Sequence, residues 1–264
     1  MALGILAAYR VLLGLGRRAG LDPERLSNLV VLLVFSGLAG ARLFYVAEHW
    51  SWYAQDPLSA LRIWEGGLMY YGSIAVAAAV LAVWCAVRRR PALQMLDLFA
   101  AVVPLGQAFG RVGCFLNGCC YGRVSSGPFA VSYPAHSVPW QEQLAAGSIG
   151  ETAARSLAVV PVQLYEAAGC AALCAALVAL HRRLFPPAAE GAGSARSPLR
   201  GLVLAGYLAG YGVLRFATET LRADERAHPF GGPFSISQAI SLAALCAAAA
   251  LCAAAALRRR RASA

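Results

Sequence analysis

The sequence is poor in charged residues and contains no lysine. Charged residues make up 14% of its 264 residues, whereas a soluble globular protein carries about 25%. Hydrophobic residues make up 59%, and the mean hydropathy is +0.59. This composition excludes a disordered chain and argues against a soluble enzyme. The net charge of +10 would suggest nucleic-acid binding on a soluble domain, so the placement of the arginines decides what it means.

Long apolar stretches predict an all-α integral membrane protein. A spanning helix needs about 20 apolar residues, and seven stretches reach or approach that length. They cover residues 2–16, 26–47, 67–87, 93–113, 161–180, 201–219 and 233–257. We therefore expect a seven-span helical bundle that forms a single membrane domain over residues 1–264. Because the first stretch is short, we expect a truncated first span, or else a helix that inserts only partly.

The arginines are concentrated in alternate loops. Fourteen of them follow the first, third, fifth and seventh stretches, whereas the loops at 49–66, 114–160 and 220–232 together hold five. Positively charged loops stay in the cytoplasm, which predicts a periplasmic N-terminus and a cytoplasmic C-terminus. In this orientation residues 114–160 form a small periplasmic cap, and residues 184–200 form a cytoplasmic linker.

Six charged residues lie within or at the ends of the apolar stretches. They are Arg42, Asp97, Arg111, Glu166, Arg215 and Glu219. A charge at the bilayer centre costs at least about 2.5–3.5 kcal/mol, so such residues face the bundle interior or a water-filled cavity. Helical spacing places Arg215, Glu219 and Arg222 on one face. Pairing alone could explain them, but an excess of arginine over acid suits an anion such as a lipid phosphate.

Two glycine-rich turns add further candidates. Residues 110–123, GRVGCFLNGCCYGR, combine four glycines with the side-chain donors of Arg111, Asn117 and Arg123. Residues 66–72, GGLMYYG, place two tyrosine hydroxyls at the predicted outer side. Glycine permits tight turns and a close approach of backbone to a ligand, so both turns are candidate parts of a site.

Three of the eight cysteines, Cys114, Cys119 and Cys120, are clustered on the predicted outer side. Their C-x4-C-C spacing lacks the paired C-x2-C of a zinc site. A metal site and a disulfide or reactive thiol stay open as alternatives, but we expect no metal and tight packing of small residues. The other five lie in apolar helices, where cysteine acts as a small hydrophobic residue.

Several motifs together resemble the prolipoprotein diacylglyceryl transferases, a family of bacterial inner-membrane enzymes with seven spans. Residues 110–123 resemble the family signature G-R-x-G-N-F-x-N-G-E-x-x-G-R, and residues 64–72 resemble W-[DE]-G-G-x-x-[FY]-[HY]-G. Residues 163–166 are similar to the Q-L-Y-E segment, and residues 211–222 to Y-G-x-x-R-x-x-x-E-x-x-R. The resemblance extends from about residue 38 to residue 245.

The resemblance implies an activity and a site. The diacylglyceryl group of phosphatidylglycerol would move to the lipobox cysteine thiol in the signal peptide of a prolipoprotein, forming a thioether and releasing glycerol phosphate. No cofactor and no nucleic acid are implied, and the partners are membrane lipid and prolipoproteins. Arg111 and Arg215 would be catalytic and bind phosphate, with Tyr71 at the place of a histidine base. The substrate site would contain Arg111, Asn117, Gly122, Gln163, Tyr165, Glu166, Tyr211, Glu219 and Arg222.

The chain departs from the family pattern at a few polar positions. Cys114 replaces an asparagine, Cys119 replaces a glutamate and Val160 replaces a histidine. Two alternatives remain at this point: a transporter or channel for an anionic substrate, and a membrane thiol oxidoreductase that uses the outer cysteines. A transporter would favour broken helices in two symmetric halves, and the sequence shows no such repeat.

Overall fold

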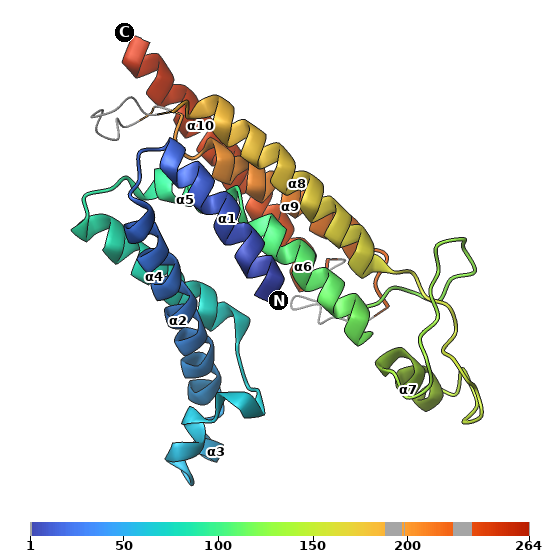
Figure 1. Cartoon of the computed structure of the whole chain (residues 1–264). Helices are drawn as coiled ribbons and strands as arrows, with labels where there is room; N and C mark the ends of the chain where they lie inside the picture. The colour runs from blue at the N-terminus through green and yellow to red at the C-terminus, as the bar shows by residue number, and fades with distance from the viewer. Residues whose placement is uncertain (1, 188–196, 198, 224–233, 264) are drawn as a thin grey trace. The chain divides into compact units, whose positions relative to one another are not determined.

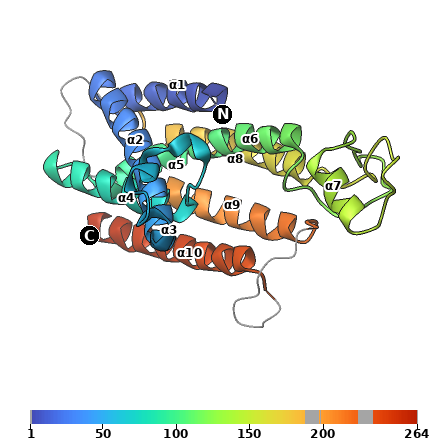
Figure 2. The same ribbon diagram turned by 90° about the horizontal axis from the view of Figure 1, so that it is seen from below.

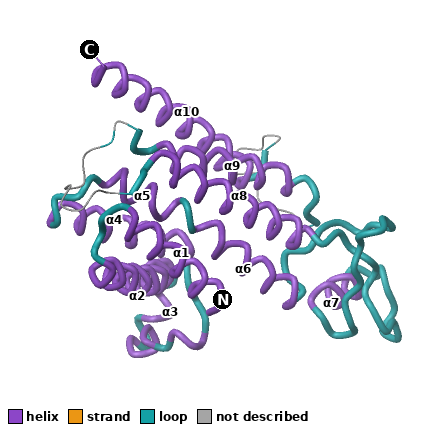
Figure 3. Tube along the Cα trace, turned by 45° about the horizontal axis from the view of Figure 1, so that its top comes forward, coloured by secondary structure: helices purple, strands orange, loops and turns teal. Residues whose placement is uncertain are grey.

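The computed structural model describes residues 2–187, 197, 199–223 and 234–263. Within these ranges the chain forms helices joined by loops, with isolated β-bridges but no strand (Figure 3). Most of the linker expected at residues 184–200, and most of the loop expected at 220–232, lie outside the described residues. The predicted all-α architecture is confirmed for the part of the chain that is described.

Five helical segments among the described residues are long and apolar enough to cross a membrane. They are Pro23–Glu48, Tyr70–Val87, Ala92–Asn117, Val162–Leu184 and Ile236–Arg261. Helices α1 (Ala2–Arg18) and α9 (Leu202–Glu219) fall outside this group. The structure thus supports a membrane protein with several spans, while the number seven stays a prediction.

The chain divides into two compact units. The first contains residues 1–15, 96–186 and 196–264, and the second contains residues 16–95 and 187–195. Helices α6 (Val103–Asn117), α8 (Val162–Leu184), α9 and α10 (Ile236–Ser263) of the first unit run side by side (Figures 1 and 2). Helix α8 packs against both α6 and α9, and α9 packs against α10, so side chains of α6, α8 and α9 can meet.

Asp97 in α5 (Ala92–Ala100) has a structural partner. Its side chain is fully buried, and its two carboxylate oxygens accept hydrogen bonds from the backbone N–H groups of Gly201 (2.5 Å) and Leu204 (2.8 Å). The first N–H groups of a helix lack partners within the helix, and a carboxylate there satisfies them. Asp97 therefore caps α9 and fixes where that helix begins.

Residues 118–161 form a folded segment beyond the end of α6. It contains α7 (Val138–Ala145) and is otherwise made of loops. Tyr133, Trp140 and Val159 are buried in it, and the indole N–H of Trp140 donates to the carbonyl of Ala153 at 2.7 Å. These contacts give the segment a small core of its own.

The second unit is built on α2 (Pro23–Glu48) and α4 (Tyr70–Val87), with the short α3 (Trp50–Tyr53) and two 3-10 turns (Pro57–Leu61 and Ile63–Glu65) between them. The two long helices touch at Gly40 and Gly72. A Cβ atom on either glycine would lie within 2.6 Å of the other's carbonyl oxygen, so the backbones approach as small residues allow in membrane helices.

Arg42 is buried in α2 and binds main-chain carbonyls. Its guanidinium donates to the carbonyl oxygens of the connection between α3 and α4, at 2.7–3.3 Å. Those acceptors are Ser59, Ala60, Arg62, Gly66 and Gly67. This arginine thus holds a loop against α2, and the loop's carbonyls supply the partners that its buried guanidinium needs.

Candidate active site

A buried carboxylate on α8 joins two arginines of neighbouring helices. Glu166 lies in the second turn of α8, and only 1% of its side chain is exposed. Its Oε2 lies 2.7 Å from Arg111 Nε on α6, and its Oε1 accepts a hydrogen bond from Arg215 Nη1 on α9 at 3.1 Å. Thr218 donates to the same Oε1 at 3.1 Å. Because a buried charge is costly unless it is paired, Glu166 ties α6, α8 and α9 together.

Arg215 directs its guanidinium at protein partners. Besides Glu166, its Nη2 lies 2.6 Å from Glu219 Oε2 and donates to Ser237 Oγ at 3.1 Å. Ser235 in turn donates to Glu219 Oε1 at 2.8 Å. The spacing of four residues on α9 places Arg215 and Glu219 on one helix face, and in the structure the two side chains pair. Arg111, Glu166, Arg215 and Glu219 form one connected set, called here the charge network.

Arg111 is the more exposed arginine of the charge network. Its side chain is 22% exposed, against 10% for Arg215. Besides its contact with Glu166 it donates to the hydroxyl of Tyr211 on α9. Its Nε is thus held by a carboxylate, while part of the side chain is exposed. An arginine that is fixed at one edge and exposed at another is suited to binding an anion.

Arg222 lies beyond the end of α9, where the chain pairs with the turn after α6. Gly122 and Arg222 form an antiparallel bridge, and Arg123 N donates to Leu221 O at 3.0 Å. A Cβ atom on Gly122 would lie 2.6 Å from Leu221 O, so this close pairing requires glycine. The expectation that Arg222 continues the helix face of Arg215 is therefore wrong, because α9 ends at Glu219 and the backbone bonds to another segment.

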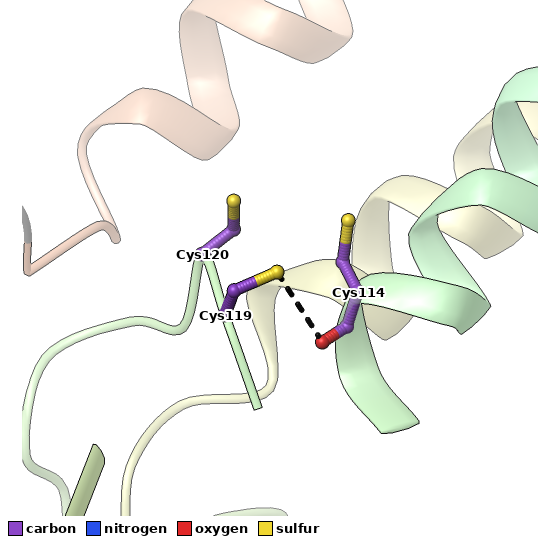
Figure 4. Close-up of side chains that lie close together, drawn as sticks. All are labelled: Cys114, Cys119 and Cys120. Atoms are coloured by element: carbon purple, nitrogen blue, oxygen red, sulfur yellow. Dashed lines mark hydrogen bonds between the residues drawn. The ribbon is translucent and has the colours of Figure 1, made fainter. Parts of the chain in front are cut away.

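The turn after α6 brings three thiols together (Figure 4). Cys114 lies in the last turn of α6, which ends at Gly118 with a φ of 73°, and Cys119 and Cys120 follow. The three Sγ atoms lie within 4.8 Å of one another. Burial raises the pKa of the Cys120 thiol, but a hydrogen bond and the positive charge of Arg222 outweigh burial, so this pKa lies below its ordinary value.

Gln163 anchors the same turn to the start of α8. It is fully buried, and its Nε2 donates to the carbonyl of Cys119 at 2.8 Å and to the hydroxyl of Tyr133 at 3.4 Å. Burial raises the pKa of Tyr133, which therefore stays neutral near pH 7. The glutamine thus links the thiol cluster to α8 and to the folded segment at 118–161.

Comparison with known proteins identifies the family. A sequence model of the family described as prolipoprotein diacylglyceryl transferase matches residues 1–254. The phosphatidylglycerol–prolipoprotein diacylglyceryl transferase of Synechococcus elongatus is 32% identical over 249 residues, which cover 92% of this chain and 78% of that protein. Transferase 2 of Clostridium perfringens is 28% identical over 245 residues, which cover 93% of this chain and 84% of that protein.

The chain belongs to the prolipoprotein diacylglyceryl transferase family. The family that the motifs predicted is confirmed, and with it the class of enzyme, a transferase. The transporter and thiol oxidoreductase alternatives lose their support, because the family match covers nearly the whole chain.

The predicted site residues of this transferase fall into three groups. Most of them lie in or beside the charge network and the turn after α6: Arg111, Gly122, Gln163, Glu166, Tyr211, Arg215, Glu219 and Arg222. Asn117 at the end of α6 and Tyr165 in α8 are exposed. Tyr71 is exposed at the start of α4 and belongs to the second unit.

Sequence reasoning gave no role to three hydroxyl side chains of the transferase that bind the charge network. Thr218 reaches Glu166, Ser237 reaches Arg215 and Ser235 reaches Glu219. Thr218 carried one signal, its spacing of three residues from Arg215. The two serines lie at the start of α10, and only the tertiary packing of α9 on α10 reveals their role.

Proposed function

We propose that the chain transfers the diacylglyceryl group from phosphatidylglycerol to the lipobox cysteine thiol of prolipoproteins. The names of its relatives state this donor and this acceptor, and the relatives align with more than nine-tenths of the chain. The observation that carries the proposal is Arg111, a partly exposed arginine whose Nε is held by a buried carboxylate.

Arg111 binds the phosphate of the lipid in this proposal. Its contact with Glu166 fixes the plane of the guanidinium, and the donor to Tyr211 fixes its tilt. Arg215, with its three protein partners, acts mainly by positioning Glu166. A planar guanidinium offers two parallel donors to phosphate oxygens, so the remaining edge of Arg111 suits a phosphodiester.

The chemistry explains why an arginine here speeds the reaction. The thiolate sulfur attacks the glycerol carbon that bears the phosphate, a C–S bond forms, and the C–O bond breaks with its electron pair on the phosphate oxygen. The phosphodiester carries one negative charge, and the released glycerol phosphate carries more. A fixed cation stabilises the transition state more than the bound substrate, and that difference is what lowers the barrier.

The thiol must lose its proton before it attacks. Tyr71 stands at the position of the family's histidine, but a phenol is a poor base at neutral pH. We therefore assign to Tyr71 a role in orienting a substrate. Asn117, Gly122, Gln163, Tyr165 and Arg222 complete the proposed substrate site.

The membrane arrangement belongs to the same proposal. The chain forms a single domain of seven spans in the bacterial inner membrane, with a periplasmic N-terminus and a cytoplasmic C-terminus. Residues 114–160 form a periplasmic cap over the outer end of the site. The uneven distribution of arginines supports this orientation. A reporter that is active only in the cytoplasm should give signal when fused to the C-terminus, and a silent but well-expressed fusion would reverse the orientation.

Transfer by the purified chain tests the proposed activity. The full chain, placed in nanodiscs that contain phosphatidylglycerol, should add one diacylglyceryl group to a peptide with a lipobox cysteine, as read by mass spectrometry. Nanodiscs with phosphatidylcholine alone, and a peptide with serine in place of the cysteine, are the controls. A folded chain that gives no product with phosphatidylglycerol refutes the proposal.

A further inference from the structure

We propose that Cys114, Cys119 and Cys120 form a three-thiolate site for Zn²⁺ whose fourth position is open to the thiol of the acceptor substrate. The zinc site itself stands on the geometry of the three cysteines. The assignment of the fourth position to a substrate thiol rests on the proposed function. This inference replaces the expectation that the three cysteines only pack as small residues.

The three sulfurs are already close to the spacing that zinc requires. Their Sγ atoms lie within 4.8 Å of one another. Sulfurs bound tetrahedrally at about 2.3 Å from zinc lie about 3.8 Å apart, so each pair needs to close by at most about 1 Å. In Figure 4 the Cys119 thiol points toward the last turn of α6, between its two neighbours. Rotation of thiol side chains on the exposed side of the turn supplies this movement.

The backbone of the turn brings the three residues together. Gly118 ends α6 in the left-handed conformation, and Cys119 N donates to Cys114 O at 3.1 Å. Cys120 has a φ of 62°, which a residue with a side chain adopts at an energetic cost. The fold therefore holds Cys120 in a strained conformation that keeps its sulfur beside the other two. The C-x4-C-C spacing alone does not predict that the three sulfurs converge, because their convergence depends on how α6 ends.

The donor set favours zinc with one open position. Among the described residues no histidine or carboxylate completes the group of three thiols. Soft thiolates select Zn²⁺ or Cu⁺, and a zinc ion with three protein ligands retains a position for water or substrate. Three thiolates and Zn²⁺ carry one net negative charge, and Arg222, which hydrogen-bonds to Cys120, lies there to balance it.

The three thiols lie where the thiol of the acceptor substrate must lose its proton. This is the step for which the chain lacks a base. Cys114 lies one turn after Arg111 on α6, and the three sulfurs lie within 4.8 Å of one another, so the thiols lie near the proposed phosphate site. A thiol that coordinates zinc gives up its proton, here to solvent, and stays bound as a thiolate. The thiolate can then attack the glycerol carbon as the phosphate leaves on the side of Arg111. Tyr71 need not remove a proton in this arrangement.

Metal content tests the site without any reference to transfer. The full chain, purified in detergent under reducing conditions and dialysed against Zn²⁺, should retain about one zinc per chain, with about three sulfur ligands at about 2.3 Å in X-ray absorption spectra. The triple variant Cys114→Ser, Cys119→Ser, Cys120→Ser should lose it. The matched control Cys246→Ser, Cys252→Ser, which changes two exposed cysteines of α10, should keep it. Cobalt in place of zinc should show thiolate charge-transfer bands, which reports on the site even where the triple variant folds poorly.

Four results would overturn the zinc site, and the first three concern the wild-type chain. These are a wild-type chain that retains no zinc, a disulfide among the three cysteines in the reduced preparation, and retention of copper in preference to zinc. Equal zinc in wild type and in a folded triple variant would place the metal elsewhere and overturn it as well.

The open position is tested with the cobalt-loaded chain. A peptide with a lipobox cysteine should shift the cobalt absorption bands, and the same peptide with serine should not; unchanged bands with the cysteine peptide overturn the open position. If the chain binds zinc but never transfers a diacylglyceryl group, the proposed function is refuted and the proposed metal site still holds. Transfer that is unaffected by complete zinc removal would remove the catalytic part of this inference and leave the proposed function intact.

Discussion

Arg42 and Arg111 are both arginines on apolar helices, yet their surroundings differ. Arg42, in the second unit, donates to five backbone carbonyls, lies 5.2 Å from the centroid of the Tyr53 ring and holds a loop in place. Arg111, in the first unit, pairs with the buried carboxylate of Glu166 and keeps 22% of its side chain exposed. The carbonyls use the donors of Arg42, so this arginine has none left for an anion. The carboxylate of Glu166 holds only one edge of Arg111, which can therefore still bind an anion.

The comparison shows that an arginine within a membrane helix does not by itself indicate a ligand site. Its cost in the bilayer predicts a polar surrounding, and that surrounding can be the protein's own backbone. The type of partner and the exposed edge of the guanidinium separate the two roles. Substitutions at five positions can break or sharpen this distinction, and they follow from the largest expected effect to the smallest.

Glu166→Ala should have the largest effect. It leaves the buried Arg215 and the half-buried Arg111 without their shared acid, and breaking a buried ion pair costs about 3–5 kcal/mol. The folded fraction in detergent should fall, as measured by unfolding in increasing denaturant. Glu151→Ala, at an exposed position, is the matched control. Unchanged unfolding of the Glu166 variant would show that the charge network does not hold the helices together.

Arg111→Ala should abolish most transfer while leaving the chain folded. Removal of one donor to a developing negative charge typically costs about 10²–10³-fold in rate. Arg111→Lys should restore only part of the rate, because lysine lacks the planar pair of donors. Arg182→Ala removes an exposed arginine of α8 and should transfer normally. Near-normal lipidation by the Arg111→Ala chain, at equal protein level, would exclude the phosphate role.

Arg215→Ala should also abolish transfer, but it should lower the folded fraction as well. The change leaves Glu166 and Glu219 without a shared guanidinium, so part of the folded fraction should be lost together with activity. Activity per folded chain and folded fraction, measured side by side, separate it from Arg111→Ala. An Arg215→Ala chain with full activity would show that positioning of Glu166 is not needed.

Arg42→Lys should destabilise the second unit without changing the chemistry. The lysine keeps the charge but cannot reach all the carbonyls that the fork of Arg42 binds, and a hydrogen bond to a charged group contributes about 1.5–3 kcal/mol. The folded fraction should fall, and the transfer rate per folded chain should stay that of the wild type. A rate that falls with no loss of folded protein would place Arg42 in the site.

Tyr71→Phe should have the smallest effect. A general base contributes about 10²–10⁴-fold, and a phenol that only orients a substrate contributes far less. The dependence of the transfer rate on pH should keep its shape. A large loss of rate, or a changed pH profile, would restore Tyr71 as the base.

The sequence predicted the helices and the local pairs better than the contacts between helices. The spacing of Arg215 and Glu219 was enough to predict that they share a helix face, where they form an ion pair. The role of Glu166 as the link between two arginines depends on how α6 and α9 flank α8, which no local pattern contains. Asp97 gave only the signal of a charge in an apolar stretch, and its role as the cap of α9 required the fold.

Lipid binding by the Arg111 variant tests the central claim most directly. The wild type, Arg111→Ala and Arg182→Ala are each presented with mixed phosphatidylglycerol and phosphatidylcholine, and the retained lipid is counted by native mass spectrometry. We expect the wild type and Arg182→Ala to retain phosphatidylglycerol in preference to phosphatidylcholine, and Arg111→Ala to lose that preference while it stays folded. An unchanged preference in the Arg111→Ala chain would contradict the assignment of Arg111 to the lipid phosphate.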